Sequence, residues 1–365
     1  MQVNTYAEID LEAVKHNISE IKKIIPSTTY FMAVVKANAY GHGVVAVSRA
    51  AMEAKANYLA VANLKEALEL REAGTQLPIL ILTESPTSVM DEIVHHRLTQ
   101  TVYSFAEAKA LSDESLRREK KSSIHIKIDT GMGRVGVAPS EAIALYNKIS
   151  SLPNLMIEGI FTHFAKAEEH ADSYTAQQFD KFKSVISRLD KITLKHAANS
   201  AATLFHPNTH LDMVRVGLMM YGLYPAGGMH RSISLRPALS FKTRVVYLKR
   251  IPAGSSLSYG GTHVTSKETT IATLPVGYAD GYSRGLGNKG QVLIKGKRYP
   301  VVGAVSMDMI LVDIGNSKID IGEEVAIIGT QGLESITVDE LARLDSTISY
   351  EIICGIGKRV PRVYR

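Results

Sequence analysis

The sequence lacks the features that mark secreted and membrane-spanning proteins. It has one cysteine, Cys354, so no disulfide can form within the chain and a reducing compartment is expected. The first residues show no basic segment followed by an apolar one, and no apolar run approaches the length of a bilayer span. We therefore expect a cytoplasmic protein with no signal peptide and no membrane partner.

The charge is mildly basic but is spread along the chain. There are 42 Lys and Arg residues against 36 Asp and Glu residues, for a formal net charge of +6. No dense basic block and no alternation of basic with aromatic residues occurs, so a nucleic-acid partner is not expected. Apolar residues make up 45% and charged residues 21%, as in ordinary globular proteins, and 365 residues suffice for two domains.

Strand-like and helix-like segments alternate through the first two thirds of the chain. The predicted strands lie near residues 30–36, 58–63, 78–83, 99–103, 123–129, 155–163, 194–198 and 212–216. The predicted helices between them lie near 43–54, 64–74, 88–96, 105–118, 138–152 and 172–191, after a first helix that Asp10 can cap. Eight strands mostly separated by helices predict a (β/α)₈ TIM-type barrel over residues 1–235, with an open doubly wound sheet as the alternative.

The pattern changes near residue 235. Short β-like stretches separated by Gly, Pro and Asn turns are Ala238–Tyr247, Glu268–Pro275, Gln291–Lys295, Val301–Ile314 and Glu324–Ile328. Only Val338–Leu344 has a helical pattern there. Residues 236–365 are therefore predicted to form a mainly β domain of ordinary size.

Polar residues gather where the predicted strands end, which is where barrel enzymes place their catalytic groups. The apolar run Phe31–Val35 is followed directly by Lys36. Partial desolvation favours the neutral amine, which can condense with an aldehyde, although a strand-end lysine can also simply extend to water. The other strand ends carry Lys127 and Asp129, the loop 131–136, His163, His196 with Asn199 and Ser200, and Arg215 followed by Gly217 and Leu218.

The loops after the last two predicted strands suggest a phosphate site. They offer the Ser200 hydroxyl and the amides of Gly217 and Leu218, and Gly217 lets the backbone approach an anion. A phosphate at this rim, facing an amine on the first strand, is the layout that pyridoxal phosphate needs.

Two other sequence patterns suggest a dinucleotide site and a metal site, but each has weaker support. Gly131, Gly133 and Gly136 satisfy the dinucleotide pattern G-x-G-x-x-G, but Arg134 lies inside it and the next strand ends at His163 rather than at an acidic residue. Histidines also suggest a metal site, yet none form H-x-H or H-E-x-x-H pairs. These histidines are His42, His163, His170, His196, His206 and His210.

Seven short motifs together carry a resemblance to a known family. They are Ala33–Gly43, Lys127–Arg134, His196–Ser200, Val214–Gly217, Ser258–Gly260, Gly277–Gly281 and Ser306–Asp308. In this order, and nearly end to end, the chain resembles the bacterial alanine racemases, which are pyridoxal-phosphate enzymes with a (β/α)₈ barrel and a C-terminal β domain. The resemblance implies interconversion of L- and D-alanine, which would supply D-alanine for peptidoglycan or serve its catabolism.

The resemblance also implies two catalytic bases. Lys36 would hold the cofactor and act on one face, and Tyr259 would act on the other, because racemisation removes the α-proton from one face and returns it to the opposite one. Tyrosine has an ordinary pKa near 10, so Tyr259 needs help to act as a base near neutral pH. Tyr259 and Met307 would reach into the partner's barrel, which makes the protein a homodimer with shared active sites.

Further roles are implied for residues within the motifs and for one residue near the C-terminus. The cofactor-binding residues would be Lys36, Tyr40, His163, Ser200, Arg215, Gly217, Leu218 and Tyr350. The substrate-binding residues would be Arg134, Met307 and Tyr278, with support from Lys127, His196, Asn199 and Asp308, and with no metal. Arg215 would face the pyridine nitrogen without giving up a proton, and His196 would orient it. Lys127 matches a lysine that is carbamylated in some members, where it holds the arginine that corresponds to Arg134.

Specificity and two rival functions stay open at this level. Tyr259, Tyr278 and Tyr350 would favour a methyl side chain, with serine a poor second substrate, but Ala304 and Ser306 stand where other members carry larger or charged residues. A pyridoxal-phosphate carrier would share the barrel but lack the β domain. A barrel decarboxylase of basic amino acids would need an acidic pocket, for which the sequence offers no candidate.

Overall fold

The computed structural model describes residues 4–169, 173–189, 191–225 and 232–365. These residues fall into two compact units. One unit spans Glu12–Ala39 and Val44–Arg236, and the other spans Met1–Leu11, Tyr40–Gly43 and Pro237–Arg365. We refer to them as the barrel unit and the β unit.

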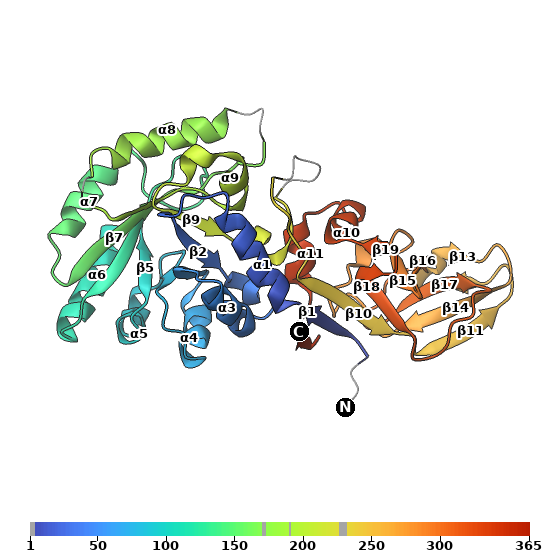
Figure 1. Ribbon diagram of the computed structural model, residues 1–365. Helices are drawn as coiled ribbons and strands as arrows, with labels where there is room; N and C mark the ends of the chain where they lie inside the picture. The colour runs from blue at the N-terminus through green and yellow to red at the C-terminus, as the bar shows by residue number, and fades with distance from the viewer. Residues whose placement is uncertain (1–3, 170–172, 190, 226–231) are drawn as a thin grey trace. The chain divides into compact units, whose positions relative to one another are not determined.

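Eight parallel strands form the centre of the barrel unit (Figure 1). They are β2 (Tyr30–Val34), β3 (Tyr58–Val61), β4 (Ile79–Ile81), β5 (Thr99–Val102), β6 (Ser122–Lys127), β7 (Leu155–Phe161), β8 (Leu194–His196) and β9 (Met213–Val216). Each of β2 to β7 pairs with the next strand, and β9 pairs back with β2. Between β8 and β9 the Asp212 amide donates to the Lys195 carbonyl at 3.1 Å, and the Arg215 amide donates to the Ala198 carbonyl at 2.9 Å. The strands therefore form a nearly closed (β/α)₈ barrel, as predicted, and not an open sheet.

Helices surround these strands (Figure 1). They are α1 (Leu11–Lys22), α3 (Val44–Glu53), α4 (Leu64–Glu72), α5 (Met90–His95), α6 (Phe105–Arg117), α7 (Ala142–Ser150), α8 (Tyr174–Ile186) and α9 (Ser200–Phe205). In α1, Val14, Ile18 and Ile21 repeat at three- and four-residue spacing and are fully buried. Asn63 and Ser104 cap α4 and α6 by accepting hydrogen bonds from backbone amides of the first turn. Capped amphipathic helices thus cover strands such as β3, in which all four residues are buried.

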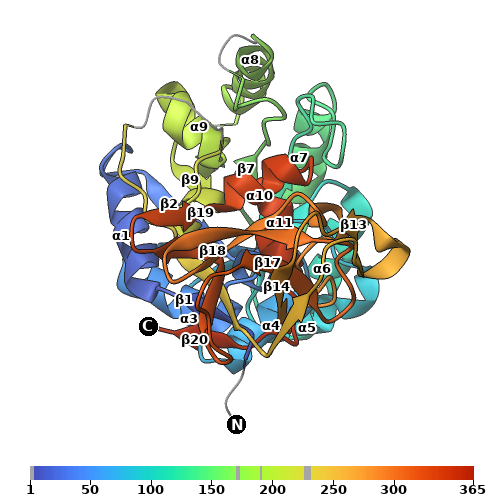
Figure 2. The same cartoon turned by 90° about the vertical axis from the view of Figure 1, so that its right-hand side faces the viewer.

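The β unit is built on one large sheet, which Figure 2 turns toward the viewer. Its order is β11-β14-β17-β16-β15-β18-β10-β1-β20, with β19 beside β18. These strands are β1 (Tyr6–Ile9), β10 (Leu239–Arg244), β11 (Tyr247–Ile251), β14 (Thr269–Leu274), β15 (Gln291–Ile294), β16 (Lys297–Val302), β17 (Ile310–Gly315), β18 (Glu324–Gln331), β19 (Glu334–Ile336) and β20 (Arg362–Tyr364). A small ladder joins β12 (Ser256–Leu257) to β13 (His263–Val264). Buried and partly exposed residues alternate along β10 and β17, as expected for antiparallel strands with one packed face.

Two features of the β unit differ from the sequence-based expectations. The helix α10 (Val338–Leu344) is present, but a second helix, α11 (Ser349–Gly355), follows it. Two adjacent isoleucines and the lack of a side-chain cap give α11 a weak helical signal. In addition, β1 pairs with β10 and with β20, so the first strand groups with the β unit rather than with the barrel.

None of the helices in the described part of the chain combines the length and the apolar character that crossing a membrane requires.

Candidate active site

A left-handed turn follows Lys36 at the end of the first barrel strand. Residues 37–40 all have φ between 52° and 54° within the short segment α2 (Lys36–Tyr40), and none of them is glycine. Such residues cost about 1–2 kcal/mol each in this conformation. Backbone strain of this kind is found mainly at functional sites, and here it directly follows the lysine that the sequence singles out.

Two side chains hold this turn in place. The Asn38 side-chain oxygen accepts a hydrogen bond from the Val44 amide at 2.9 Å. The Glu66 carboxylate accepts from the amides of Ala37 at 2.7 Å and Ala62 at 2.8 Å. Glu66 therefore ties the segment after the first barrel strand to the segment after the second, a role that the sequence analysis missed.

Four cationic side chains act on His163. Burial lowers the pKa of His163 well below its ordinary value, and the charges of Arg215, Arg134, Lys127 and Lys36 lower it further. The imidazole is therefore neutral near pH 7. This concentration of positive charge at the carboxyl ends of the barrel strands makes the region a site for anionic groups.

Lys127 lies at the end of β6 and is almost fully buried. Its ammonium group is 5.4 Å from the centre of the Phe161 ring. Burial lowers the pKa of Lys127 to about 8, and the charges of Arg134 and Arg215 act in the same direction, against Asp129. A pKa this close to neutrality leaves a reactive fraction of neutral amine at pH 7–8.

Arg215 is fixed from several sides at the end of the barrel. One guanidinium nitrogen, Nη1, lies 3.0 Å from His196 Nδ1, and Nη2 donates to the carbonyls of Thr162 at 2.7 Å and Ala197 at 2.9 Å. The guanidinium also lies over the Phe161 ring. Burial lowers the pKa of Arg215 to about 9, which still keeps the group charged at neutral pH.

The glycine-rich loop after β6 has a local structural explanation. One carboxylate oxygen of Asp129 accepts hydrogen bonds from the amides of Gly131 and Gly133, both at 3.0 Å. At Gly136, with φ of +133°, a Cβ would lie 2.7 Å from the Asp129 nitrogen. These glycines shape the loop that carries the exposed Arg134, so the match to a dinucleotide motif has no support in this geometry.

The residues predicted for a phosphate lie together at the start of α9 and after β9. The Gly217 amide donates to the Ser200 hydroxyl at 3.0 Å, and the Asn199 side chain caps α9 by accepting from the Ala202 amide at 2.9 Å. Leu218 begins the short 3₁₀ helix η3 (Leu218–Tyr221). The Gly217 amide is thus already bonded to Ser200 and is not an independent donor in this arrangement.

Two tyrosines predicted to contact the cofactor belong to the β unit. The rings of Tyr40 and Tyr350 have centroids 5.8 Å apart at an angle of 44°. Burial raises the pKa of Tyr40, so its phenol stays protonated. The adjacent Gly41 allows close backbone packing, because a Cβ there would lie 2.2 Å from the Ile353 carbonyl oxygen.

The other predicted residues of the β unit are exposed. Tyr259 is 73% exposed, Met307 52% and Tyr278 44%. Ser258, just before Tyr259, has φ of +61°, and its hydroxyl donates to the Ala304 carbonyl at 2.6 Å. Tyr259 is therefore carried on strained, anchored backbone while its own side chain projects away from the unit.

The segment that carries Tyr278 packs against the segment that carries Met307. Their backbones hydrogen-bond, with the Tyr278 amide donating to the Ser306 carbonyl at 3.1 Å. Arg359 donates at 2.7 Å to Asp280 and also at 2.7 Å to Asp308, which joins the two segments. Asp308 therefore helps to hold these two segments together through its ion pair with Arg359.

The predicted site residues thus fall into two sets, one in each unit. The barrel unit brings together Lys36, Lys127, Arg134, His163 and Arg215, with His196 behind Arg215. The β unit pairs Tyr40 with Tyr350 and holds Tyr278 beside Met307. Among the described residues, which do not include His170, no group of three or more His, Cys, Asp or Glu could hold a metal ion.

Gln178, on α8, is a further residue that the sequence reasoning missed. It is fully buried, and its amide donates to the His163 carbonyl at 3.1 Å and accepts from the Ala165 amide at 2.9 Å. These bonds fix the backbone around His163. The only signal in the sequence was a polar residue next to apolar helix positions, which is too common to identify a site residue.

Comparison with known proteins assigns the chain to a family over almost its whole length. Residues 9–225 match the family model for the alanine racemase N-terminal domain, and residues 238–364 match that for the alanine racemase C-terminal domain. An alanine racemase of Halothermothrix orenii is 46% identical over 366 residues, which is 99% of this chain and 97% of that protein.

Solved structures agree with this assignment. An alanine racemase of Clostridium difficile 630 superimposes with a TM-score of 0.95 at 38% identity, covering 100% of this chain and 96% of the other. An alanine racemase of Bartonella henselae with covalently bound pyridoxal phosphate has a TM-score of 0.91 at 29% identity, with full coverage of both chains. Together with the barrel, the β unit and the polar residues at the strand ends, these matches show that the chain belongs to the alanine racemase family.

Proposed function

We propose that the protein interconverts L- and D-alanine with pyridoxal phosphate as cofactor, and that Lys36 and Tyr259 are its two bases. Membership of the family supports the reaction, and the Bartonella relative with covalently bound pyridoxal phosphate supports the cofactor. The observation that carries the residue assignment is the group of cationic side chains, Lys36 among them, that surrounds a neutral His163 and a fixed Arg215.

The residues present fit pyridoxal phosphate. A primary amine stands at a strand end for the aldehyde, and a charged arginine that only donates hydrogen bonds is available for the ring nitrogen. The cationic surroundings suit a phosphate and a substrate carboxylate. When bound, the cofactor withdraws electron density from the Cα of the amino acid and so makes its proton easier to remove.

Within this scheme the protein moves a proton between two faces. The amine of Lys36 accepts the α-proton on one face, and the phenol of Tyr259 supplies a proton on the other, or the reverse for the other enantiomer. Arg215 remains charged near neutral pH, because its pKa of about 9 lies above that range. It therefore donates a hydrogen bond without passing a proton to the ring, which limits side reactions. Arg134 and the Met307 amide would hold the substrate carboxylate.

We propose that Lys127 is carbamylated. The neutral amine would combine with carbon dioxide to give a carbamate and release one proton, which replaces a buried cation with an anion beside Arg134. The pKa of about 8 supplies neutral amine for this step, and the surrounding cations favour its product. Exposure to ¹³C-labelled carbon dioxide should give a carbamate carbon resonance that is absent from Lys127→Ala, and no such resonance would refute the proposal.

A homodimer with shared sites follows from the same scheme. Tyr259 and Met307 are large apolar side chains left exposed on the β unit, as expected for residues that enter a second copy of the chain. Under this proposal, Lys36 of one chain and Tyr259 of the other form a single site.

Mixing two inactive variants tests this directly. Lys36→Ala and Tyr259→Phe would each be inactive alone. If the sites are shared, a mixed dimer contains one site with both substitutions and one with neither. Random re-association should then restore about one quarter of the wild-type activity. If each chain supplies both bases of its own site, mixing restores nothing and the shared-site proposal fails.

The reaction itself is tested by proton exchange in deuterium oxide. Starting separately from L- and D-alanine, both should gain deuterium at Cα and converge on an equal mixture, and Lys36→Ala should abolish this. Cofactor binding without exchange would point to a carrier instead, and carbon dioxide release from lysine or arginine would point to a decarboxylase. Because racemisation is reversible, it would serve either the supply of D-alanine for peptidoglycan or its catabolism.

A further inference from the structure

A line of polar side chains leads from Arg215 and His196 into the interior of the barrel, and its inner members, His125 and Glu158, have no part in the reaction as proposed above. His196 Nε2 lies 2.9 Å from His125 Nδ1, and both imidazoles are fully buried. His125 Nε2 lies 3.7 Å from a carboxylate oxygen of Glu158, which is longer than a hydrogen bond, so this contact is electrostatic. Arg215 on β9, His196 on β8, His125 on β6 and Glu158 on β7 thus form one continuous series.

The hydrogens of this series can be assigned because an arginine has no acceptor atom. The N–H of Arg215 must donate to His196 Nδ1, so the proton of neutral His196 is on Nε2. That N–H must in turn donate to His125 Nδ1, which places the proton of neutral His125 on Nε2, facing Glu158. Burial lowers the pKa of both histidines, which agrees with two neutral rings. All N–H groups of the series therefore point from Arg215 toward the carboxylate.

Packing restricts the positions of the His125 and His196 rings. His196 is stacked on Phe161 at 4.8 Å with an angle of 7° between the rings. Gly159 lies opposite His125 in the β6–β7 ladder, and a Cβ at this position would come within 2.6 Å of the imidazole. Packing thus fixes where each ring lies, whereas the choice between tautomers depends on the charges at the two ends.

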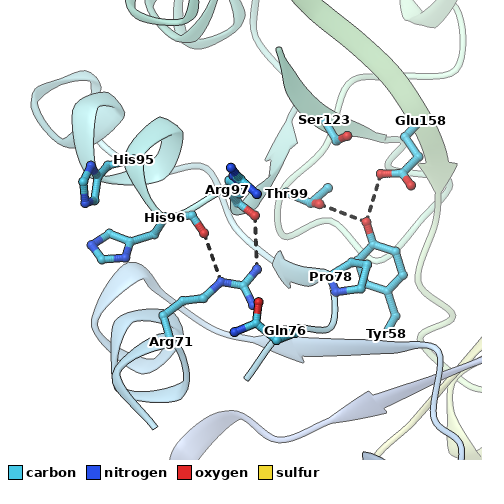
Figure 3. Close-up of a pocket in the computed structure, with 10 residues that line it drawn as sticks. All are labelled: Tyr58, Arg71, Gln76, Pro78, His95, His96, Arg97, Thr99, Ser123 and Glu158. Carbon is cyan, nitrogen blue, oxygen red and sulfur yellow. Dashed lines mark hydrogen bonds between the residues drawn. The ribbon is translucent and has the colours of Figure 1, made fainter. Parts of the chain in front are cut away.

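Glu158 is held as a carboxylate. The Tyr58 hydroxyl donates to it at 2.9 Å, and the Thr99 hydroxyl lies 2.9 Å from the Tyr58 oxygen (Figure 3). Burial raises the pKa of Glu158, but contacts with His125, Tyr58 and Ser123 outweigh this effect, so the net shift is downward.

Glu158 also faces solvent at the mouth of the barrel opposite to Lys36. Tyr58 and Thr99 are the first residues of β3 and β5, and they line a pocket of about 480 Å³ together with Glu158 (Figure 3). The catalytic residues stand at the other ends of the strands. Arg71, on the wall of this pocket, donates to four backbone carbonyls and so has a structural role.

We propose that Glu158, held by Tyr58 at the far mouth of the barrel, is a positioning residue that orients His125 and His196 so that His196 presents a lone pair to Arg215. This rests on the proposed function of Arg215 beside the cofactor ring. The single negative charge of Glu158 stabilises the aligned N–H dipoles of both imidazoles. Removing that charge leaves His125 free to reverse its tautomer, which would break the bond to His196 and weaken the hold on Arg215.

The test replaces Glu158 by glutamine, which has nearly the same size and whose side-chain oxygen can still accept from Tyr58. Glu114→Gln is the control, because Glu114 is also a partly exposed carboxylate of the barrel unit but lies on α6, where it pairs with Arg118. The first measurement uses cofactor-free protein with ¹⁵N-labelled histidine, assigned by substituting each histidine in turn. In the parent, His125 and His196 should both show the Nε2–H tautomer. In Glu158→Gln, His125 should show a mixture of tautomers and His196 should shift with it, whereas Glu114→Gln should match the parent.

The second measurement is steady-state racemisation. We expect kcat to fall about three- to tenfold in Glu158→Gln with little change in KM for alanine, because Arg134 is untouched. Glu158→Asp keeps the charge, so its histidine resonances and its kcat should both lie close to those of the parent. Should the glutamine variant fail to fold, Tyr58→Phe removes the hydroxyl donor and should shift the same resonances less. Unchanged histidine resonances, or changed resonances with wild-type kcat, would overturn the proposal. If the parent itself does not racemise alanine, the proposed function fails while the resonances still report on the series.

Discussion

Substituting Gly159 by alanine should damage the barrel core through a single methyl group. The added Cβ would lie 2.6 Å from two atoms of the His125 ring and 2.7 Å from a third, and a fully buried ring cannot move aside. Overpacking of this kind costs about 1–3 kcal/mol. Displacing His125 would also weaken its bond to His196, for about 1 kcal/mol more. The sum of about 2–4 kcal/mol corresponds to a fall in Tm of roughly 4–16 °C for a unit of this size.

Thermal unfolding of the cofactor-free protein measures this loss without relying on the active site. The control is Gly355→Ala, because a Cβ at Gly355 meets no atom within 4 Å and its backbone is not left-handed. That control should unfold within about 0.5 kcal/mol of the parent. In the holoenzyme, Gly159→Ala should also lower kcat about tenfold or more by shifting Arg215. A Tm within about 1 °C of the parent would show that the core absorbs the methyl group, and the steric reasoning would be wrong.

Three further predictions concern strain, buried hydrogen bonds and pH. Ala37→Gly should raise the free energy of unfolding by up to about 1 kcal/mol in urea titrations, since glycine relieves the left-handed strain; no gain would mean that the turn is unstrained. Asn17 is fully buried and makes three hydrogen bonds to the backbone of residues 220 and 236. Asn17→Ala should therefore lower the free energy of unfolding by about 2–4 kcal/mol in urea titrations. A decrease below about 1 kcal/mol would contradict this. His163 and His196 have pKa values depressed in the folded protein, so below about pH 6.5 the unfolded chain binds more protons and Tm should fall as pH falls; a flat Tm between pH 7 and 5 would exclude this.

The barrel could be predicted because its strands are buried on both faces. The apolar run Phe31–Val35 can be recognised as a strand from its own residues, and the structure places β2 at Tyr30–Val34. The loops between such runs then place Lys36 and Arg215 on one rim by topology alone. The family that the motifs indicated is likewise confirmed by its two domain models.

Other features depend on contacts that local patterns do not encode. Residues 37–40 contain two alanines and no glycine, so propensity favours a right-handed helix there, whereas the hydrogen bonds of the Asn38 and Glu66 side chains support the left-handed turn. His125 and His196 are 71 residues apart, and their contact arises because β6 and β8 flank β7 in the barrel. Glu158 carries no sequence signal of its own, since a single acidic residue in a strand is most often simply exposed.

Because β1 pairs with both β10 and β20, this part of the sheet can form only after these later strands have been synthesised. The strand Tyr6–Ile9 is made first, yet its neighbours are Leu239–Arg244 and Arg362–Tyr364, the last strand of the chain. At ordinary translation rates, roughly 20–70 s pass between the synthesis of β1 and that of β20. The barrel unit can meanwhile form from residues already released, whereas the sheet of the β unit stays incomplete until β20 has been synthesised. A fragment that begins at residue 237 would lack this strand and leave β10 and β20 with unpaired edges, so the β unit should aggregate when it is expressed without the N-terminus.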